Sequence, residues 1–406
     1  MSEKKKLLWV GDAACPSGFA LVTHRVLDVL CTTFDVTVLG INYRGDPHTY
    51  PYPIYAAAPG GELLGVGRLI WMCDVCKPDV IVLQNDGWNI PHYMRQLARF
   101  AEYARIPVIV IVAVDGKNFQ GPWLDRVSLA IFWTHFALDE ARKGGYTGPA
   151  EVIPLGVDLD IYYPLDTLDA RGRRLPRELD FAFIVGNVNR NQPRKRLDLT
   201  IQYFAEWVHR ENVADAYLYL HVAPTGDIGI DVKQLSEYYG VLDRLILMQP
   251  SAWYGIPEHE MRDTYNCFDL QITTTQGEGN GFSTFEGMAC GIPQIVPAWS
   301  ALGELTRDVA WQVSCRSTVV GPPYVNVLGG VPDREGFVQA LHTFYTDSAR
   351  RMVYRQRGLD YVSQPHFRWS FIAQQFDRVI QERLDGIRDE SERDDRETES
   401  VHSEVS

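Results

Sequence analysis

The residues best suited to chemistry lie in one glycine-rich segment of the sequence. A predicted strand, Asp269–Thr273, runs into a loop that ends at Gly281, and the loop opens a predicted helix, Ser283–Cys290. Glycines let the backbone approach a ligand closely and adopt positive φ. The first amides of a helix have no partner inside the helix and bind anions, so the segment predicts a phosphate site. The residues that would form this site are Gly281, Phe282, Ser283 and Thr284.

Two carboxylates accompany this phosphate site. Glu278 lies in the loop, and Glu286 lies about one turn inside the predicted helix. Carboxylates accept hydrogen bonds from hydroxyl groups, so the segment suits a ligand with both hydroxyls and a phosphate, such as a nucleotide sugar. A structural alternative stays open. Ser283 and Glu286 also match a capping box, in which Glu286 only bonds to the start of its own helix.

The elements that must position these residues alternate along the whole chain. Short β-branched runs are separated by longer amphipathic stretches, which is typical of parallel strands covered by helices on both faces. In the first half the predicted strands are Leu7–Val10, Asp35–Leu39, Val80–Leu83, Val108–Val114 and Leu129–Trp133, and the helices are Phe19–Leu30, His92–Arg105 and Phe136–Lys143. In the second half the predicted strands are Phe181–Val185, Ala216–Val222, Arg244–Leu247, Asp269–Thr273 and Gln294–Val296. The helices there are Leu197–Arg210, Asp231–Tyr239, Glu258–Tyr265, Ser283–Cys290, Arg334–Thr346 and Trp369–Leu384.

The alternation pauses over residues 158–180, a stretch rich in Pro, Asp and Arg that indicates a linker. The predicted fold class is therefore α/β, with two Rossmann-like doubly wound domains facing each other across a cleft. We expect an N-terminal domain over residues 1–160 and a C-terminal domain over residues 161–365. We expect the helix over 366–385 to pack back on the N-terminal domain and the acidic segment 386–406 to be a disordered tail.

The glycine-rich segment resembles a known family signature. Glu278 and Glu286 are separated by seven residues that include Gly281-Phe282-Ser283, and Met-Ala-Cys-Gly-Ile-Pro follows over 288–293. This pattern is similar to that of retaining glycosyltransferases of the two-Rossmann (GT-B) architecture, in the large glycosyltransferase group 1 class (family 4-like). The family motif usually reads Glu-Gly-Phe-Gly-Leu, and Asn280 here replaces the aromatic residue, which would change the sugar pocket.

The resemblance extends to a basic loop. The segment Gly186–Arg196, which contains Arg190, Arg194 and Lys195, resembles the family loop whose cations hold the donor diphosphate. Arginine and lysine suit this role because they offset phosphate charge. Asn187 stands where the family often has arginine, so Arg190 or Arg194 would replace it. The alternative is a loop whose charges are solvated.

In the N-terminal half, the resemblance concerns two turns that follow predicted strands. Gly18 lies in a turn similar to the family's first glycine loop, which approaches the donor phosphates. Asp115 follows the strand Val108–Val114, where family members often carry histidine near the reacting sugar. Asp115 either binds a hydroxyl of the sugar or acceptor, or caps the next segment. Three aromatic residues lie in predicted loops: Trp88, Phe119 and Trp123. Their rings either stack on an acceptor or anchor the core.

Composition limits the partners. The chain has 39 Lys and Arg against 52 Asp and Glu, a formal net charge of −13, so it has no global attraction for nucleic acid or anionic membranes. The seven cysteines form no disulfide framework, and a cytoplasmic location is expected. Asp158-Leu-Asp160 matches the Asp-x-Asp pair of metal-dependent transferases of another fold, but it lies in the interdomain segment, so no metal or other cofactor is expected.

The resemblance implies transfer of a sugar from a UDP-, GDP- or ADP-linked donor to an acceptor hydroxyl, with retention of anomeric configuration. Glu278 and Asp115 would act at the reacting sugar, and Glu286 would bind ribose hydroxyls. The expected acceptor is a saccharide, a lipid-linked molecule or a small molecule rather than nucleic acid. Two alternatives are a nucleotide-sugar epimerase or hydrolase of the same fold, and a non-catalytic subunit that binds a sugar nucleotide.

Overall fold

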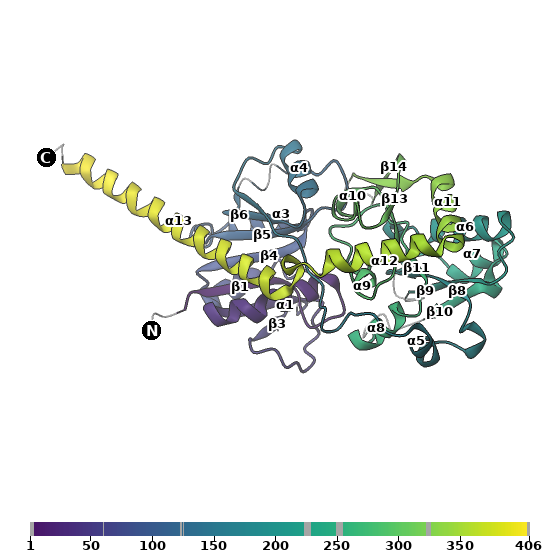
Figure 1. Cartoon of the computed structure of the whole chain (residues 1–406). Coiled ribbons are helices and arrows are strands. Elements are labelled where there is room, and N and C mark those ends of the chain that lie inside the picture. The colour runs from purple at the N-terminus through teal and green to yellow at the C-terminus, as the bar shows by residue number, and fades with distance from the viewer. Residues whose placement is uncertain are drawn as a thin grey trace.

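The structure, a computed structural model of the 406-residue chain, contains two parallel sheets, each in its own lobe (Figure 1). It describes residues 4–59, 61–121, 124, 126–222, 229–248, 255–321 and 326–403, with side chains in the last helix described as far as Ile387. Two doubly wound α/β domains are present, as the sequence predicts.

The N-terminal sheet has seven parallel strands in the order β3-β2-β1-β4-β5-β6-β7. They are β1 Lys6–Asp12, β2 Asp35–Ile41, β3 Ile54–Ala56, β4 Val80–Asp86, β5 Val108–Ala113, β6 Leu129–Phe132 and β7 Ala150–Val152. Apolar runs such as β5 are buried because helices cover both faces of the sheet. One face packs against α1 (Gly18–Thr33) and α13 (Trp369–Ser403), and the other against α2 (Arg68–Cys76), α3 (Ile90–Leu97) and α4 (His135–Lys143).

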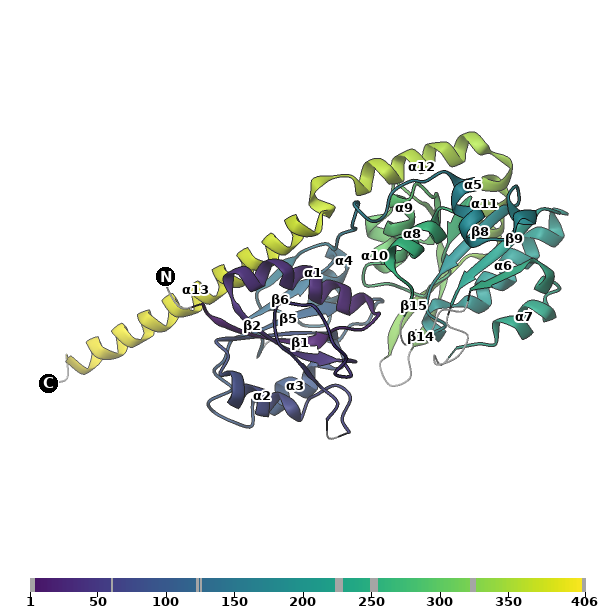
Figure 2. The same cartoon turned by 90° about the horizontal axis from the view of Figure 1, so that it is seen from below.

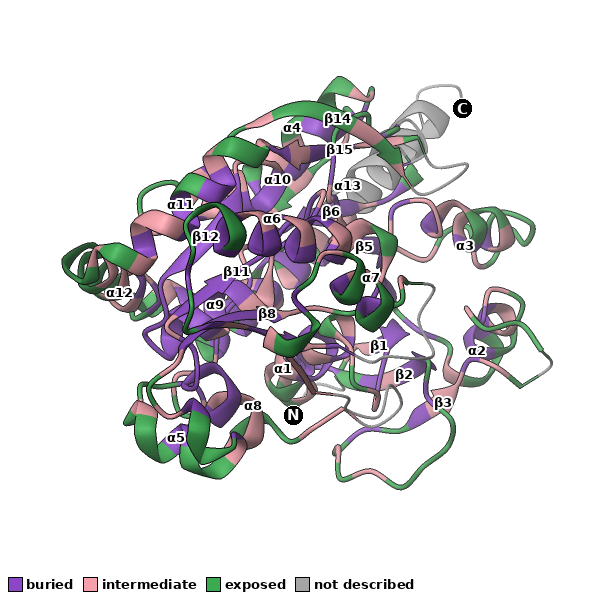
Figure 3. Cartoon of the chain, turned by 90° about the vertical axis from the view of Figure 1, so that its right-hand side faces the viewer, coloured by how far each residue is buried: buried purple, intermediate pink, exposed green. Residues whose placement is uncertain are grey.

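The C-terminal sheet has six parallel strands in the order β10-β9-β8-β11-β12-β13. They are β8 Phe183–Val188, β9 Ala216–His221, β10 Leu245–Met248, β11 Leu270–Ile272, β12 Gln294–Pro297 and β13 Trp311–Val313. One face packs against α6 (Leu197–Arg210), α7 (Val232–Tyr238) and α11 (Arg334–Thr346). The other packs against α5 (Thr167–Arg174), α8 (Glu258–Tyr265) and α9 (Phe282–Ala289). Figure 3 shows the buried residues concentrated in the strands and on the inner faces of the helices.

Elements of the C-terminal domain contact the N-terminal domain. The antiparallel hairpin β14–β15 (Cys315–Gly321 and Val327–Pro332) reaches the N-terminal domain, where Lys117 forms a bridge with Leu328. Helix α10 (Ser300–Leu305) places Glu304 against the start of α4, where the carboxylate accepts hydrogen bonds from the amides of His135 and Phe136 at 3.0 and 2.6 Å. Residues of both lobes therefore meet at polar contacts.

The end of the chain returns from the second lobe to the first. Helix α12 (Ser348–Val362) lies along the C-terminal domain, and α13 then runs along the N-terminal domain (Figure 2). Residues of α13 such as Trp369, Phe376 and Ile380 belong to the core of the N-terminal domain. Within the described residues, none of the helices combines the length and the apolar character needed to span a membrane.

Some local predictions were wrong. The helix predicted over His92–Arg105 ends at Leu97, and the predicted linker contains the helix α5. The backbone of α13 is helical to Ser403, and the disordered tail expected over 386–406 stays a prediction.

Candidate functional site

The glycine-rich loop ends in a left-handed turn that starts α9. Gly281 has a φ of 97°, and α9 begins at Phe282. A side chain at Gly281 would be strained at this φ, and its Cβ would lie 2.6 Å from Leu302. The amide of Thr284 already donates to the carbonyl of Gly281 at 2.9 Å. The amides of Phe282 and Ser283 are therefore the ones left to bind an anion.

The capping-box interpretation of Ser283 and Glu286 is wrong. Gly281 is the N-cap residue, so Ser283 is already the second residue of the helix. Glu286 instead accepts a hydrogen bond from the Tyr265 hydroxyl at 2.5 Å. Burial raises the pKa of the Glu286 carboxyl to about 7, while the Tyr265 hydrogen bond acts in the opposite direction. As a whole residue, Glu286 is half buried.

Glu278 brings the glycine-rich loop and the basic loop together. Only 8% of its surface is exposed. Its carboxylate lies 2.5 Å from Nζ of Lys195 and 3.1 Å from Nη1 of Arg194. Burial opposes ionisation of Glu278, but these two cations outweigh it and lower the pKa to about 2. Glu278 is therefore an anion. It forms ion pairs with Lys195 and Arg194, the two cations that are predicted from the sequence to bind a diphosphate.

Arg194 also reaches into the N-terminal domain. Its Nε lies 3.1 Å from Oδ2 of Asp115, and its Nη1 donates to the carbonyl of Gly277. A Cβ at position 277 would lie 1.6 Å from the carbonyl oxygen of Asp115, so only glycine fits there. Burial raises the pKa of Asp115, and Arg194 opposes that shift. The two residues predicted to act at the reacting sugar, Asp115 and Glu278, are thus joined by one arginine.

The starts of α1 and α9 face each other. A Cβ on Gly18, the first residue of α1, would lie 3.2 Å from the ring of Phe282, the first residue of α9. Ser17 caps α1 by accepting from the amide of Ala20 at 3.0 Å. Each helix start carries a partial positive charge. Together with Lys195 and Arg194, these two helix starts make the junction of the domains suitable for an anion.

Other predicted residues lie less directly at this point. The side chain of Thr284 is buried, with 2% exposed. Arg190 is exposed, and its charge acts on Asp12 of the N-terminal domain. Asn187 is fully buried and donates to the Thr200 hydroxyl at 2.9 Å, so this position is closed to a phosphate. The position of Arg194 beside Glu278 and Asp115 favours it over Arg190 as the cation that would replace the family's arginine at position 187.

Sequence reasoning missed two carboxylates of the N-terminal domain. Asp12 ends β1, where it accepts hydrogen bonds from Ser17 at 2.6 Å and from Asn42 at 3.1 Å. Asp86 ends β4, and burial together with the neighbouring Asp115 raises its pKa to about 7. Their positions were a usable signal, because polar residues at the carboxyl ends of parallel strands face the ligand in doubly wound folds.

The remaining candidates belong elsewhere. Phe119 is buried and packs against Gly87, where an added Cβ would lie 2.4 Å from its ring, so it anchors the core. Trp88 is half buried, and Trp123 lies outside the described residues. Asp158, the first residue of the Asp-x-Asp pair, forms an ion pair with Arg25 of α1 at 2.8 Å.

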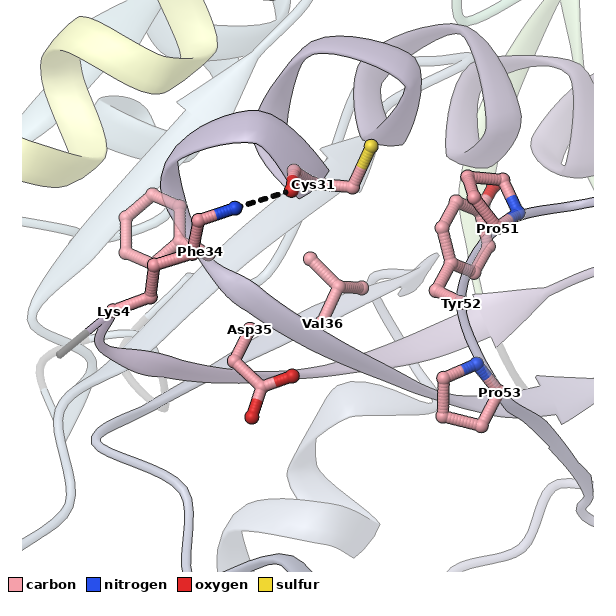
Figure 4. Close-up of a pocket in the computed structure, with 8 residues that line it drawn as sticks. All are labelled: Lys4, Cys31, Phe34, Asp35, Val36, Pro51, Tyr52 and Pro53. Carbon is pink, nitrogen blue, oxygen red and sulfur yellow. Dashed lines mark hydrogen bonds between the residues drawn. The ribbon is translucent and has the colours of Figure 1, made fainter.

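A separate pocket of about 350 Å³ lies in the N-terminal domain (Figure 4). It is lined by the end of α1 and the start of β2, including Phe34 and Asp35, and by the segment Pro51–Pro53. These are the amino ends of the strands β2 and β3. The candidate site lies at the carboxyl ends, on the opposite edge of the sheet, so this pocket is not part of it.

Comparison with known proteins supports the same architecture. No family model matches the sequence. D-inositol 3-phosphate glycosyltransferase of Geodermatophilus obscurus is 32% identical over 181 residues, which are 42% of this chain and 38% of that protein. The chain spans half or less of the length of the first curated relatives it matches.

Solved structures resemble nearly the whole chain. Sucrose-phosphate synthase from Thermosynechococcus elongatus superposes with a TM-score of 0.73 at 17% identity, covering 94% of this chain and 99% of that one. Anabaena HepE in complex with UDP and glucose superposes with a TM-score of 0.70 at 16% identity, covering 93% and 100%. The fold is therefore the GT-B architecture of two facing Rossmann-like domains.

Proposed function

We propose that this chain is a glycosyltransferase that moves a sugar from a nucleoside diphosphate donor to an acceptor hydroxyl with retention of configuration. The observation that carries the proposal is the junction at Glu278, where Lys195, Arg194 and the free amides of α9 meet. These groups offer an anion site beside a carboxylate that can bind sugar hydroxyls. The relative's name, D-inositol 3-phosphate glycosyltransferase, supports this class of reaction.

Each residue has a role in the proposed reaction. The donor diphosphate binds to the amides of Phe282 and Ser283 and to Lys195 and Arg194, close to the start of α1 at Gly18. Arg190 supplies further positive charge at the same junction. Glu286 accepts from the ribose hydroxyls, which places the nucleoside along α9.

The chemistry follows from the charge of the leaving group. The bond between the anomeric carbon and the diphosphate oxygen breaks, and a bond from that carbon to the acceptor oxygen forms on the same face. The acceptor proton passes to the departing diphosphate. Stabilisation of the diphosphate by Lys195 and Arg194 then supplies most of the rate enhancement. Glu278 and Asp115 orient the sugar, and Glu278 stabilises the oxocarbenium-like centre.

In this proposal, the donor diphosphate replaces the Glu278 carboxylate as the partner of Lys195 and Arg194. Lys195 and Arg194 hold the Glu278 carboxylate. A diphosphate competes for the same two cations, so binding releases the Glu278 carboxylate toward the sugar hydroxyls. The donor thereby assembles the site that acts on it.

Among UDP, GDP and ADP donors, we place UDP first because HepE, which shares the fold, was crystallised with UDP and glucose. The acceptor is a saccharide, a lipid-linked molecule or a small molecule. The proposed enzyme acts in the cytoplasm, where nucleotide sugars are made.

The experiment is a product analysis in two steps. A thermal-shift screen with UDP, GDP, ADP and their sugars finds the nucleotide that raises the melting temperature. That donor is then incubated with the protein, with and without a panel of hydroxyl acceptors. A product that needs the acceptor and keeps the donor's anomeric configuration by NMR supports the proposal. Donor conversion that does not need an acceptor indicates an epimerase or hydrolase, and unaltered donor throughout indicates a binding subunit.

A further inference from the structure

The loop between β1 and α1, residues Ala13–Ser17, contains a residue with a strained backbone. Ala14 has a φ of 48°, in the left-handed region that residues other than glycine rarely adopt. Such a conformation persists only where the surroundings hold it, and it is found most often at functional sites. The group that bonds to Ala14 therefore helps to decide the shape of this loop.

His24 on α1 binds the backbone of the strained residue. Its Nε2 accepts a hydrogen bond from the amide of Ala14 at 2.8 Å, and only 8% of the surface of His24 is exposed. Burial, with a smaller contribution from the charge of His48, lowers the pKa of His24 to about 4. The ring is therefore neutral at pH 7, and a neutral imidazole has one nitrogen that accepts and one that donates.

The imidazole is itself held by the segment between β2 and β3. Because Nε2 accepts, Nδ1 carries the proton and donates to the Tyr52 hydroxyl at 2.8 Å. The ring of Tyr50 stacks on the imidazole, with the two centroids 3.6 Å apart. Pro51 and Pro53 flank Tyr52, and proline fixes φ. The ring of His24 is thus fixed in the orientation that places Nε2 on the loop.

The loop that His24 holds lies at the junction of the domains. A Cβ added at Gly255 of the C-terminal domain would lie 3.2 Å from Pro16. Gly18, the first residue of α1, faces the ring of Phe282 at the start of α9. Because Ala14 lies only four residues before Gly18, a change in the backbone of Ala14 would move the start of α1 relative to α9.

We propose that His24 is a positioning residue that holds the loop Ala13–Ser17 in the conformation that receives the donor diphosphate. This inference rests on the proposed function, in which the diphosphate binds close to the start of α1. His24 acts through the amide of Ala14. A loop that already has its ligand-binding conformation binds without the cost of ordering it, so loss of this hydrogen bond should weaken donor binding and slow transfer.

The first experiment measures the hold on the loop without any ligand. It compares His24→Phe, which keeps an aromatic ring against Tyr50 but removes the acceptor, with His24→Gln, which keeps an acceptor oxygen on a side chain of similar reach. The readout is hydrogen–deuterium exchange of peptides that cover Ala13–Ser17. We expect the Ala14 amide to exchange about 10-fold faster in His24→Phe than in the wild type, and within about threefold of the wild type in His24→Gln.

The second experiment measures what the loop does for the donor. The same variants are titrated with UDP, or with whichever nucleoside diphosphate raises the melting temperature, and are assayed for transfer. For His24→Phe we expect a Kd about 10-fold weaker and a kcat/KM about 100-fold lower, with both largely restored in His24→Gln. A residue that only stabilises the fold would change the melting temperature and leave both quantities as they are.

Tyr203→Phe is the matched control. Tyr203 is 4% exposed and donates to the carbonyl of Pro332 at 3.1 Å, in the core of the C-terminal domain. Loss of this hydrogen bond should lower the melting temperature without changing the loop exchange, the Kd or the kcat/KM. If His24→Phe does not fold, Tyr52→Phe replaces it. This variant removes the partner of Nδ1, so we expect smaller changes in the same direction.

Two results would overturn the inference while the proposed function stands. In the first, the wild type transfers sugar, but the loop exchanges equally fast in the wild type and in His24→Phe, or in Tyr52→Phe where that variant replaces it. In the second, the loop exchanges faster in the variant, but the Kd and the kcat/KM stay the same. If the wild type neither binds a nucleoside diphosphate nor transfers sugar, the proposed function fails and the inference fails with it.

Discussion

Nε of Arg194 lies 3.1 Å from Oδ2 of Asp115, which places a cation of the C-terminal domain on a carboxylate of the N-terminal domain. The same guanidinium binds Glu278 at 3.1 Å. Opposite charges from both domains are thus paired at the junction. A diphosphate that binds Arg194 at this junction must therefore displace a carboxylate from the guanidinium.

The first prediction separates nucleotide binding from transfer. Glu278→Gln removes the anion that competes for Lys195 and Arg194. We expect the variant to bind the nucleoside diphosphate at least as tightly as the wild type, because its cations are less strongly held. We expect kcat/KM for sugar transfer to fall about 100-fold, since the carboxylate no longer stabilises the reacting sugar. Calorimetric titration and a transfer assay measure the two quantities.

The control for this variant is Glu140→Gln. Glu140 on α4 has 4% of its surface exposed, pairs with Lys143 at 2.8 Å and accepts from the amide of Asn118 at 3.1 Å, a bond that the oxygen of a glutamine can keep. Loss of charge there should leave both quantities unchanged. Weaker nucleotide binding by Glu278→Gln would contradict the competition between carboxylate and diphosphate.

The second prediction concerns the energy of the domain junction. In a double-mutant cycle, Arg194→Met and Asp115→Asn should couple by about 1 kcal/mol or more in the free energy of unfolding, because the side chain of Asp115 is 17% exposed and that of Arg194 is 33% exposed. The exposed pair of Arg378 and Glu382 on α13 provides the comparison, with an expected coupling of about 0.3–0.5 kcal/mol. Urea denaturation measures both cycles. Equal coupling in the two pairs would show that the junction is solvated.

The third prediction is a pH dependence set by Glu286. Its pKa of about 7 lies above the usual 4.5, so the carboxyl is protonated below pH 7 and ionised above it. Ribose hydroxyls donate to the ionised form, so nucleotide affinity should rise as the pH increases through 7. Tyr265→Phe removes the hydrogen bond that favours the anion, which should move the midpoint upward.

Glu286→Gln serves as the reference for that experiment, because the nucleotide phosphate titrates identically with each variant. The difference between wild type and Glu286→Gln isolates the carboxyl. An identical pH profile for the two proteins would exclude Glu286 from nucleotide binding.

The fourth prediction concerns the cap that one domain provides for the other. Glu304 accepts hydrogen bonds from the amides of His135 and Phe136 at the start of α4. Glu304→Ala leaves both amides without this partner and should lower the free energy of unfolding by about 1 kcal/mol. Glu304→Gln keeps an acceptor oxygen and should retain more than half of that stability. If the two variants have equal stability in urea, the contact has no capping role.

The sheets could be predicted from the sequence because their strands are continuous apolar runs. Val108–Ala113 is an example, since burial on both faces leaves no polar alternation. Short strands such as Ile54–Ala56 and the hairpin beginning at Cys315 lack such runs and were missed. The helix predicted over His92–Arg105 ends at Leu97, and Phe100 beyond that end is 41% exposed.

The individual residues of the site could be predicted from the sequence, but the ion pairs between them could not. Glu278 and Lys195 each stand in a recognisable local pattern, yet they are 83 residues apart in the sequence. Their ion pair depends on how β8 and β11 lie side by side in the sheet. Asp86 carries no motif, and only its place at the end of β4 marks it.

The most direct test of the central claim is a crystal structure of the chain with the nucleoside diphosphate that raises its melting temperature. The account predicts diphosphate oxygens within hydrogen-bond distance of Lys195 and of the amides of Phe282 and Ser283, with Glu278 released from at least one of its cations. A nucleotide bound elsewhere, with the ion pair between Glu278 and Lys195 intact, would contradict the account.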